Sequence, residues 1–216
     1  MRVSIGGYAP FADSPRRTYR HGELRPLCRG RDWKNQRTAK RMRAMTQDDR
    51  LTALLARDQI RDLILDIATG VDRFDQDLLR RAIAPDARID MGGESPMTGA
   101  AFADALSPPE KAPAGRTHFI SNMRVRLDAA GETAKAESYV LSIMQVERDG
   151  DPVTRQRAGR YLDSFALRDG RWQLTARLFI DEWARIDPVT EVLATGKNRA
   201  APCPTDGRYA FWEEAV

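Results

Sequence analysis

The chain has 216 residues, of which 42% are hydrophobic and 31% charged, and its formal net charge is +4. These values are ordinary for a globular protein with one good core, and no stretch approaches the roughly 18 uninterrupted apolar residues of a membrane span. Two histidines exclude a multi-histidine metal centre, and Cys28 and Cys203 form no C-x-x-C pair. The N-terminal residues lack the apolar segment of a secretory signal, so we expect a cytoplasmic protein.

The positive charge is concentrated in residues 1–44, which hold 12 Lys and Arg against 3 Asp and Glu. Residues 45–216 hold 23 basic against 28 acidic residues, a net charge of −5. Residues 1–44 show no helical or strand period, so we expect a disordered extension. Tyr19 and Trp33 lie among the basic residues and leave a nucleic-acid-binding arm open, but the acidic remainder of the chain argues against it.

The chain from Met45 begins with helical periodicity. Apolar residues at i, i+3, i+4, i+7 and i+11 predict a first helix over residues 48–70. The residues of this stripe are Ile60, Leu63, Ile64, Ile67 and Val71. A second short helix is expected before Pro85, a strand over residues 87–91, and a third helix over residues 98–106.

The second half of the chain favours long strands joined by hairpins. Alternating or apolar runs predict strands over residues 123–127, 133–147, 157–167 and 172–183. Helices followed by a meander of strands predict an α+β fold, with the helices packed on one face of a curved, mostly antiparallel sheet. We expect this domain to occupy residues 45–187. Residues 188–216 form an irregular tail in this interpretation, and the aromatic residues 208–212 dock on the domain.

Several local strings, in this order along the chain, resemble a known family. They are residues 60–64 leading to 71–73, residues 84–87, residues 117–122, and residues 159–165 with 168–172. Together they resemble the SnoaL-like branch of the nuclear-transport-factor-2-like superfamily over residues 51–183. The resemblance implies a cone-shaped α+β barrel whose sheet wraps a deep pocket roofed by helices.

The resemblance also implies a chemical site. Dehydratase and dehydrochlorinase members of the family use an aspartate–histidine pair in the pocket, and Asp72 and His118 occupy the matching positions. These members need no metal and no organic cofactor. Where some dehydratases carry a tyrosine five residues before the aspartate, this chain has Ile67. A hydroxyl group would therefore come from elsewhere, for instance Tyr139 or Tyr161.

The chemistry is plausible from the residues themselves. A positioned imidazole can remove a proton from carbon, and a carboxylate on its other nitrogen fixes the tautomer and stabilises the imidazolium. In this hypothesis His118 is the base and then the acid, and Asp72 orients it. Arg160 could stabilise developing negative charge. The alternatives are that Asp72 only caps a turn, and that Arg160 only pairs with Asp163 or a helix carboxylate.

The leading functional hypothesis is a cofactor-independent lyase or isomerase, dehydratase-like, acting on a hydrophobic and cyclic small molecule. The alternative is a non-catalytic ligand-binding or assembly subunit with the same fold, as in the small subunits of ring-hydroxylating dioxygenases. Aromatic residues at outward strand positions predict a homo-oligomer, and the resemblance implies a dimer or trimer. Neither a membrane nor a nucleic acid is expected as a partner.

Overall fold

The computed structural model describes residues 46–108, 115–191 and 199–214. The predictions for residues 1–44 therefore lie outside the described residues. The elements in chain order are α1 (Gln47–Arg73), α2 (Gln76–Ala82), β1 (Ile83–Asp90), β2 (Met97–Thr98), α3 (Gly99–Ala105), β3 (Arg116–Leu127), β4 (Thr133–Arg148), β5 (Asp151–Arg168), β6 (Arg171–Pro188) and α4 (Gly207–Glu213).

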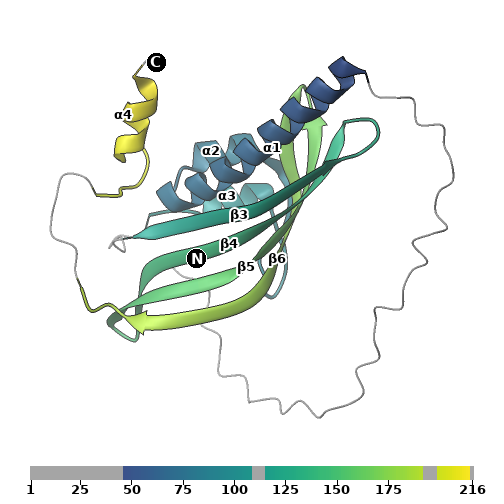
Figure 1. Ribbon diagram of the computed structural model, residues 1–216. Coiled ribbons are helices and arrows are strands. Elements are labelled where there is room, and N and C mark those ends of the chain that lie inside the picture. The colour runs from purple at the N-terminus through teal and green to yellow at the C-terminus, as the bar shows by residue number, and fades with distance from the viewer. Residues whose placement is uncertain (1–45, 109–114, 192–198, 215–216) are drawn as a thin grey trace, which may run out of the picture.

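One sheet joins all the described strands, in the order β2-β1-β6-β5-β4-β3. Strands β3 to β6 form an antiparallel meander, and β1 pairs with β6 in parallel. Figure 1 shows these long strands curving beneath α1, α2 and α3. The expected α+β class is confirmed, and the sheet is mixed and does not close.

Helix α1 begins and ends where its sequence provides caps. Thr46 and Asp49 form a reciprocal capping box, and Phe74 ends the helix in the left-handed conformation at φ 55°. Gly70 does not end the helix, which continues to Arg73. The absence of a side chain at Gly70 leaves room for Leu79, because a Cβ on Gly70 would lie 2.8 Å from the Leu79 side chain.

The main core lies between these helices and the end of the sheet at which β3 turns into β4 and β5 turns into β6. The largest fully buried apolar side chains come from α1, α2, β1, β5 and β6: Ile60, Ile64, Ile67, Leu79, Ile83, Ile89, Phe165 and Leu174. Trp172 is also buried there, whereas Trp183 is half exposed on the outer face of the sheet. The stripe predicted from the sequence therefore supplies the helical side of this core.

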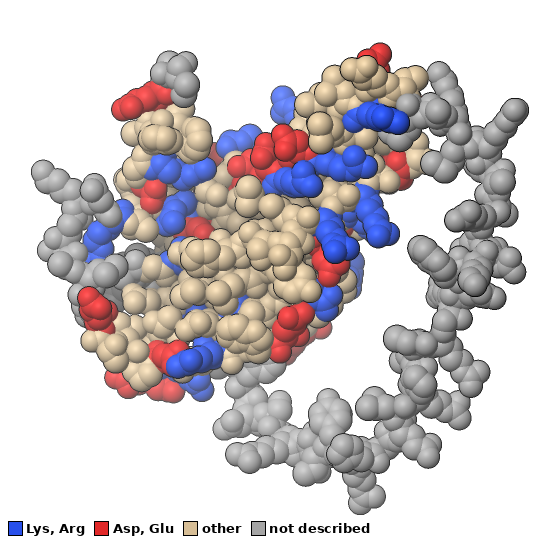
Figure 2. All heavy atoms as spheres, in the orientation of Figure 1, with Lys and Arg blue, Asp and Glu red and all other residues tan. Residues whose placement is uncertain are grey.

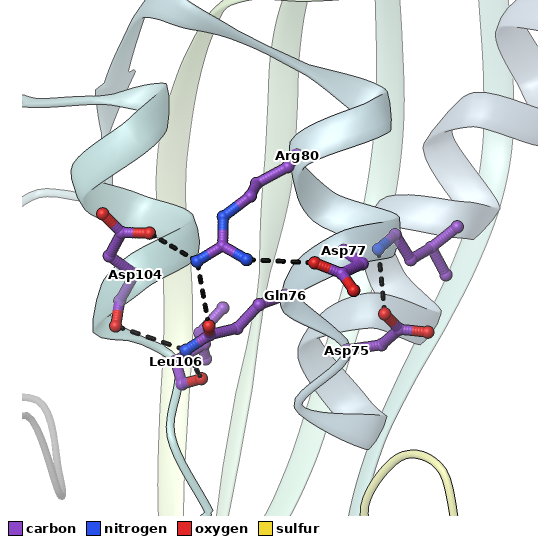
Figure 3. A network of polar contacts seen from close by, with 7 residues as sticks. Asp75, Gln76, Asp77, Arg80, Asp104 and Leu106 are labelled. Atoms are coloured by element: carbon purple, nitrogen blue, oxygen red, sulfur yellow. Dashed lines mark hydrogen bonds and ion pairs between the residues drawn. The ribbon is translucent and has the colours of Figure 1, made fainter.

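A polar cluster holds α2 against α3 (Figure 3). The Gln76 side-chain amide donates to the Leu106 carbonyl at 2.9 Å. Arg80 donates to Gln76 at 3.0 Å and to Asp104 at 2.8 Å, and it also pairs with Asp77. Because the charged side chains of this cluster are exposed, their ion pairs orient the helices and add little stability.

Several strands are longer than predicted. Strand β3 begins at Arg116 where the sequence pattern indicated residue 123, and β1 begins at Ile83 and contains Pro85. A register shift between Ser121 and Arg124, with Asn122 at φ 48°, interrupts the alternation of β3. Because of this β-bulge, the two halves of β3 do not follow one continuous period of two, and the sequence pattern indicated only the second half.

The C-terminal segment differs from the expected irregular tail because residues 207–213 form α4. The expected docking of its aromatic residues is present only for Tyr209, since the side chains of Phe211 and Trp212 are 66% and 67% exposed. The Cys203 backbone N–H donates to the Arg73 carbonyl at 2.7 Å, and the Tyr209 hydroxyl donates to Asp75 at 2.8 Å. Burial is the main cause that raises the pKa of Tyr209, and its side-chain hydrogen bonds with Cys203 and Asp75 raise this pKa further.

Figure 2 shows that the sheet face turned to the viewer is mostly tan over β3 to β6. Apolar side chains that stand on the outer face of these strands are exposed, among them Phe119 at 56% and Trp183 at 50%. Among the described helices, none is long and apolar enough to cross a membrane.

Gly159 in β5 is required by a close approach of β6. A Cβ at this position would lie 2.2 Å from the Ile180 carbonyl oxygen and 2.7 Å from the Phe179 ring. We predict that Gly159→Ala lowers the free energy of unfolding by about 1–3 kcal/mol, because one of these groups must move. Gly93→Ala is the control, since nothing lies within 4 Å of its Cβ position. Equal melting temperatures for the two variants would contradict this assignment.

Candidate active site

Asp72 lies in the last turn of α1, and its carboxylate holds two groups of the same residue on β3. One oxygen, Oδ2, accepts the backbone N–H of His118 at 2.9 Å. The other, Oδ1, lies 2.6 Å from His118 Nδ1. The two side chains are 10% and 9% exposed, so little water competes for these bonds. The contact expected from the sequence is present.

This geometry assigns the ring nitrogens of His118. An ionised carboxylate can only accept hydrogen bonds, so Nδ1 carries the proton in the neutral ring. The other nitrogen, Nε2, then holds the lone pair and is available as a base. The second carboxylate bond, to the backbone, prevents Asp72 from rotating away from the ring. Such an arrangement can orient an imidazole for general-base chemistry.

The strand register places His118 on the inner face of the sheet. His118 lies opposite Ser142 of β4, and Ser142 lies opposite Arg157 of β5. Side chains at paired positions share a face, and alternate positions along a strand share it too. The inner face of β4 thus carries buried hydroxyl groups at Ser138 and Ser142. The Ser138 hydroxyl is buried and has no hydrogen-bond partner within the described part of the chain.

Strands β5 and β6 supply a series of alternating cations and rings on this inner face. The Arg157 guanidinium lies 4.6 Å from the centre of the Phe179 ring. The rings of Phe179 and Tyr161 are 5.6 Å apart. The Arg177 guanidinium lies 3.9 Å from the centre of the Tyr161 ring. Both guanidiniums are thereby stacked on aromatic faces.

Each of these arginines also has a carboxylate partner. Arg177 and Asp163 form a bidentate pair at 2.9 and 2.8 Å, with side chains only 5% and 1% exposed. Arg157 forms a second bidentate pair with Asp181, which is half exposed. Along β5, Asp163 lies two residues from the core residue Phe165, and Arg157 lies nearer to the start of the strand at Asp151.

The remaining residues that the sequence indicated for the site are divided between the two faces. Tyr161 is buried on the inner face. Arg160 and Tyr139 point to the outer face, because they alternate with Gly159 and with Val140. Arg160 pairs with Glu137 at 3.0 Å and Glu182 at 2.8 Å. These carboxylates, Glu137 first, raise the pKa of Arg160. The structure does not bring Arg160 or Tyr139 together with the pair.

Arg160 does not pair with Asp163, which was one of the expected alternatives. Arg157, Arg177 and Ser142 were not among the site residues predicted from the sequence. For Arg157 the strand period carries a signal, because Arg157, Tyr161 and Asp163 are separated by even steps and so share a face.

A hollow of about 370 Å³ lies on the outer face, lined by Asn122, Met123, Arg124, Glu137 and Tyr139. It follows the bulge in β3 and is separated from His118 by the thickness of the sheet. No cluster of three or more His, Cys, Asp or Glu within the described ranges could hold a metal ion.

The C-terminal segment is anchored beside the pair. Arg73, the residue after Asp72, lies 3.6 Å from Asp206, and its carbonyl accepts from Cys203. Burial opposes ionisation of Asp206, but the N–H groups of Ala201 and Arg208 and the charge of Arg73 hold its pKa below the usual range. Residues 199–214 therefore fix the end of α1 that carries Asp72.

A family model described as a SnoaL-like domain matches residues 52–178. A search of curated proteins gave no match. Three solved structures show the similarity of fold. The first, named as a candidate scytalone dehydratase from Novosphingobium aromaticivorans, is 20% identical with a TM-score of 0.55, and the match covers 72% of this chain and 97% of that one.

The second is a hexachlorocyclohexane dehydrochlorinase from Novosphingobium barchaimii, 18% identical with a TM-score of 0.56, covering 68% of this chain and 99% of that one. The third is the Kfla4162 protein from Kribbella flavida, 22% identical with a TM-score of 0.54, covering 62% and 95%. At these identities the likeness concerns the fold alone.

Proposed function

Because the chain belongs to the SnoaL-like domain family, we propose that it is a cofactor-independent lyase or isomerase in which Asp72 and His118 act on a hydrophobic, cyclic small molecule. Family membership supports a lyase-like or ligand-binding role in the coarser sense. The observation that carries the finer proposal is the double contact of Asp72 with His118. The proposal assigns the activity to residues 45–187.

In the proposed reaction His118 Nε2 removes a proton from a carbon beside an activating group of the substrate. The electron pair of that C–H bond forms a new C=C bond as a hydroxyl or halide leaves from the neighbouring carbon. For a hydroxyl, the imidazolium returns its proton to the leaving oxygen, so water departs and the neutral ring is restored. For a halide, the anion departs and the imidazolium releases its proton to water. In an isomerisation the imidazolium returns the proton to another carbon.

Asp72 contributes in two ways. Its negative charge stabilises the imidazolium that exists after proton removal, and its bonds hold the ring in one orientation. Two of the structurally similar proteins carry names that describe eliminations, a dehydration and a dehydrochlorination. An oriented base next to apolar side chains such as Ile120 and Val140 is suited to both of these reactions.

The test of catalysis uses cyclic β-hydroxy ketones, whose dehydration creates a conjugated product that absorbs in the ultraviolet. With a compound that the wild-type protein converts, His118→Ala should lower turnover by roughly 10²–10⁴-fold. Asp72→Asn should lower it strongly, and the double variant should be little worse than the poorer single variant. Thr117→Ala, on the outer face beside His118, is the matched control. Wild-type turnover by His118→Ala would leave only a binding or assembly role.

We also propose that the chain forms a homo-oligomer through the outer face of the sheet. Phe119, Leu141, Ala158 and Trp183 occupy one row across β3, β4, β5 and β6. Half-exposed aromatic side chains on this row form an apolar surface of the kind that assembly buries. Figure 2 shows few charged side chains at the centre of the sheet face turned to the viewer.

Sedimentation equilibrium at micromolar concentration tests this assembly. We expect a mass at least twice the 24.3 kDa of one chain. Phe119→Asp should shift the equilibrium toward single chains, because a carboxylate in a buried interface costs free energy. Phe211→Asp, on α4 at a side chain that is 66% exposed, should not shift it. A wild-type mass near that of one chain would contradict the proposal.

A further inference from the structure

The outer face of β4 carries charges of opposite sign at its two ends. Every second side chain of a strand lies on the same face, and Tyr139 points outward, so the outward side chains of β4 are those at odd positions. They include Lys135 near the start of the strand, Leu141 in the middle and Glu147 near the end. Leu141 lies six residues from Lys135 and six from Glu147. The two charges are therefore placed symmetrically about an apolar centre.

Leu141 also belongs to the aromatic row that the proposed assembly buries. Phe119 of β3 and Trp183 of β6 lie in the same row across the sheet, and they are 56% and 50% exposed. A second copy of the chain can cover this row with its own identical row, turned by a two-fold axis. The axis can run across the strands at Leu141, or along the strands between β4 and β5.

An axis across the strands at Leu141 places β4 of one copy antiparallel on β4 of the other. Lys135 of each copy then faces Glu147 of the other copy, because both lie six residues from the axis. The pairs between these ends and the axis are Tyr139 with Ile143 and Glu137 with Gln145. Each pair along the two copies of β4 is thus oppositely charged or contains an uncharged side chain.

An axis along the strands instead places β3 on the β6 of the other copy and β4 on its β5. The register of the sheet then sets Arg124 against Leu178 and Glu147 against Pro152. Each of these contacts takes a charged group out of water without an opposite charge, which costs free energy. Charge complementarity therefore favours the axis across the strands.

The outer face has the size that a stable dimer needs. Its four long strands, about 4.8 Å apart, and the stretch of β4 from Lys135 to Glu147 span roughly 20 Å by 40 Å. The product is about 800 Å², which is also what each partner buries in an interface of standard size. The hollow of about 370 Å³ that Glu137 and Tyr139 line lies within this area. In the antiparallel arrangement it faces Ile143 and Gln145 of the other copy, whose side chains can fill it.

We propose that a second copy of the chain docks on this face in one defined register, with the two-fold axis at Leu141 and with Lys135 of each copy against Glu147 of the other. This inference rests on the proposed homo-oligomer, which it makes more specific, and it is independent of the proposed catalysis. The apolar row provides the hydrophobic stabilisation. The charged pairs lie at the rim, where they define the orientation and exclude other registers.

A zero-length carbodiimide cross-link on the full chain tests the contact. The reagent joins a lysine amine to a carboxylate only where the two groups touch, and Lys135 is the one lysine among the residues that the structure describes. Lys135 and Glu147 of the same chain are roughly 40 Å apart along β4, so an amide bond between them joins two copies. We expect mass spectrometry of the digested dimer to show this bond. Glu147→Gln should abolish it, and the control Glu132→Gln, three residues from Lys135, should retain it.

Charge reversal tests the register in solution by sedimentation equilibrium. Lys135→Glu and Glu147→Lys each place like charges at both ends of the interface, so each should weaken self-association by about 10- to 100-fold. An equimolar mixture of the two variants should associate as the wild type does, because both end pairs of the mixed dimer then have opposite charges. Glu94→Lys, in the exposed segment between β1 and β2, is the control and should not weaken association.

The measured mass distinguishes failure of the register from failure of the assembly. A wild-type mass of one chain would contradict both proposals. A wild-type dimer that lacks the bond between Lys135 and Glu147, and that both charge reversals leave intact, would overturn the register while the assembly stands. A mass of three chains would overturn the two-fold axis. Failure of the mixed variants to recover the association of the wild type would overturn the pairing of Lys135 with Glu147.

Discussion

The carboxylate of Asp72 connects the helical layer to the edge strand of the sheet. It accepts a backbone N–H of β3 and the side chain of the same residue, His118, from the last turn of α1. Two bonds to one residue define both the position of the strand edge and the orientation of the ring. The helix end that carries Asp72 is itself anchored by Arg73 to Asp206 and Cys203. The orientation of the imidazole thus depends on the packing of α1, β3 and the C-terminal segment together.

The inner face of the sheet divides into an apolar half and a polar half. Phe165, Leu174 and the stripe of α1 fill the first half and provide the hydrophobic stabilisation. The second half contains buried polar groups that cost free energy unless they are paired. Asp163 and Arg177 satisfy each other by two hydrogen bonds, and the Tyr161 ring covers the guanidinium. A fold optimised for stability alone has little use for such groups, which is consistent with a ligand-binding role for this half.

The sequence was sufficient for the order of the elements from α1 to β6, apart from the two-residue strand β2, and for the contact between Asp72 and His118. The stripe of α1 identified its buried face. Two of the predicted hairpins turn at Asp149-Gly150 and Asp169-Gly170, where all four residues have positive φ. Two local features were not predictable from periodicity. The bulge at Asn122 interrupts the alternation of β3, so its start was not predicted. Only the register shows that Tyr139 and Arg160 face outward while Arg157 faces inward. Those facts depend on pairing between strands that are distant in the sequence.

The tautomer of His118 shows whether Asp72 orients the imidazole, and long-range ¹H–¹⁵N NMR on the neutral ring measures it. The sequence has only one other histidine, His21, so the signals of His118 can be assigned with a His21→Gln variant. We predict a proton on Nδ1 and an unprotonated Nε2, and loss of this pattern in Asp72→Ala. A neutral ring that carries its proton on Nε2 in the wild-type protein would contradict this tautomer assignment, since its remaining lone pair would then face Asp72.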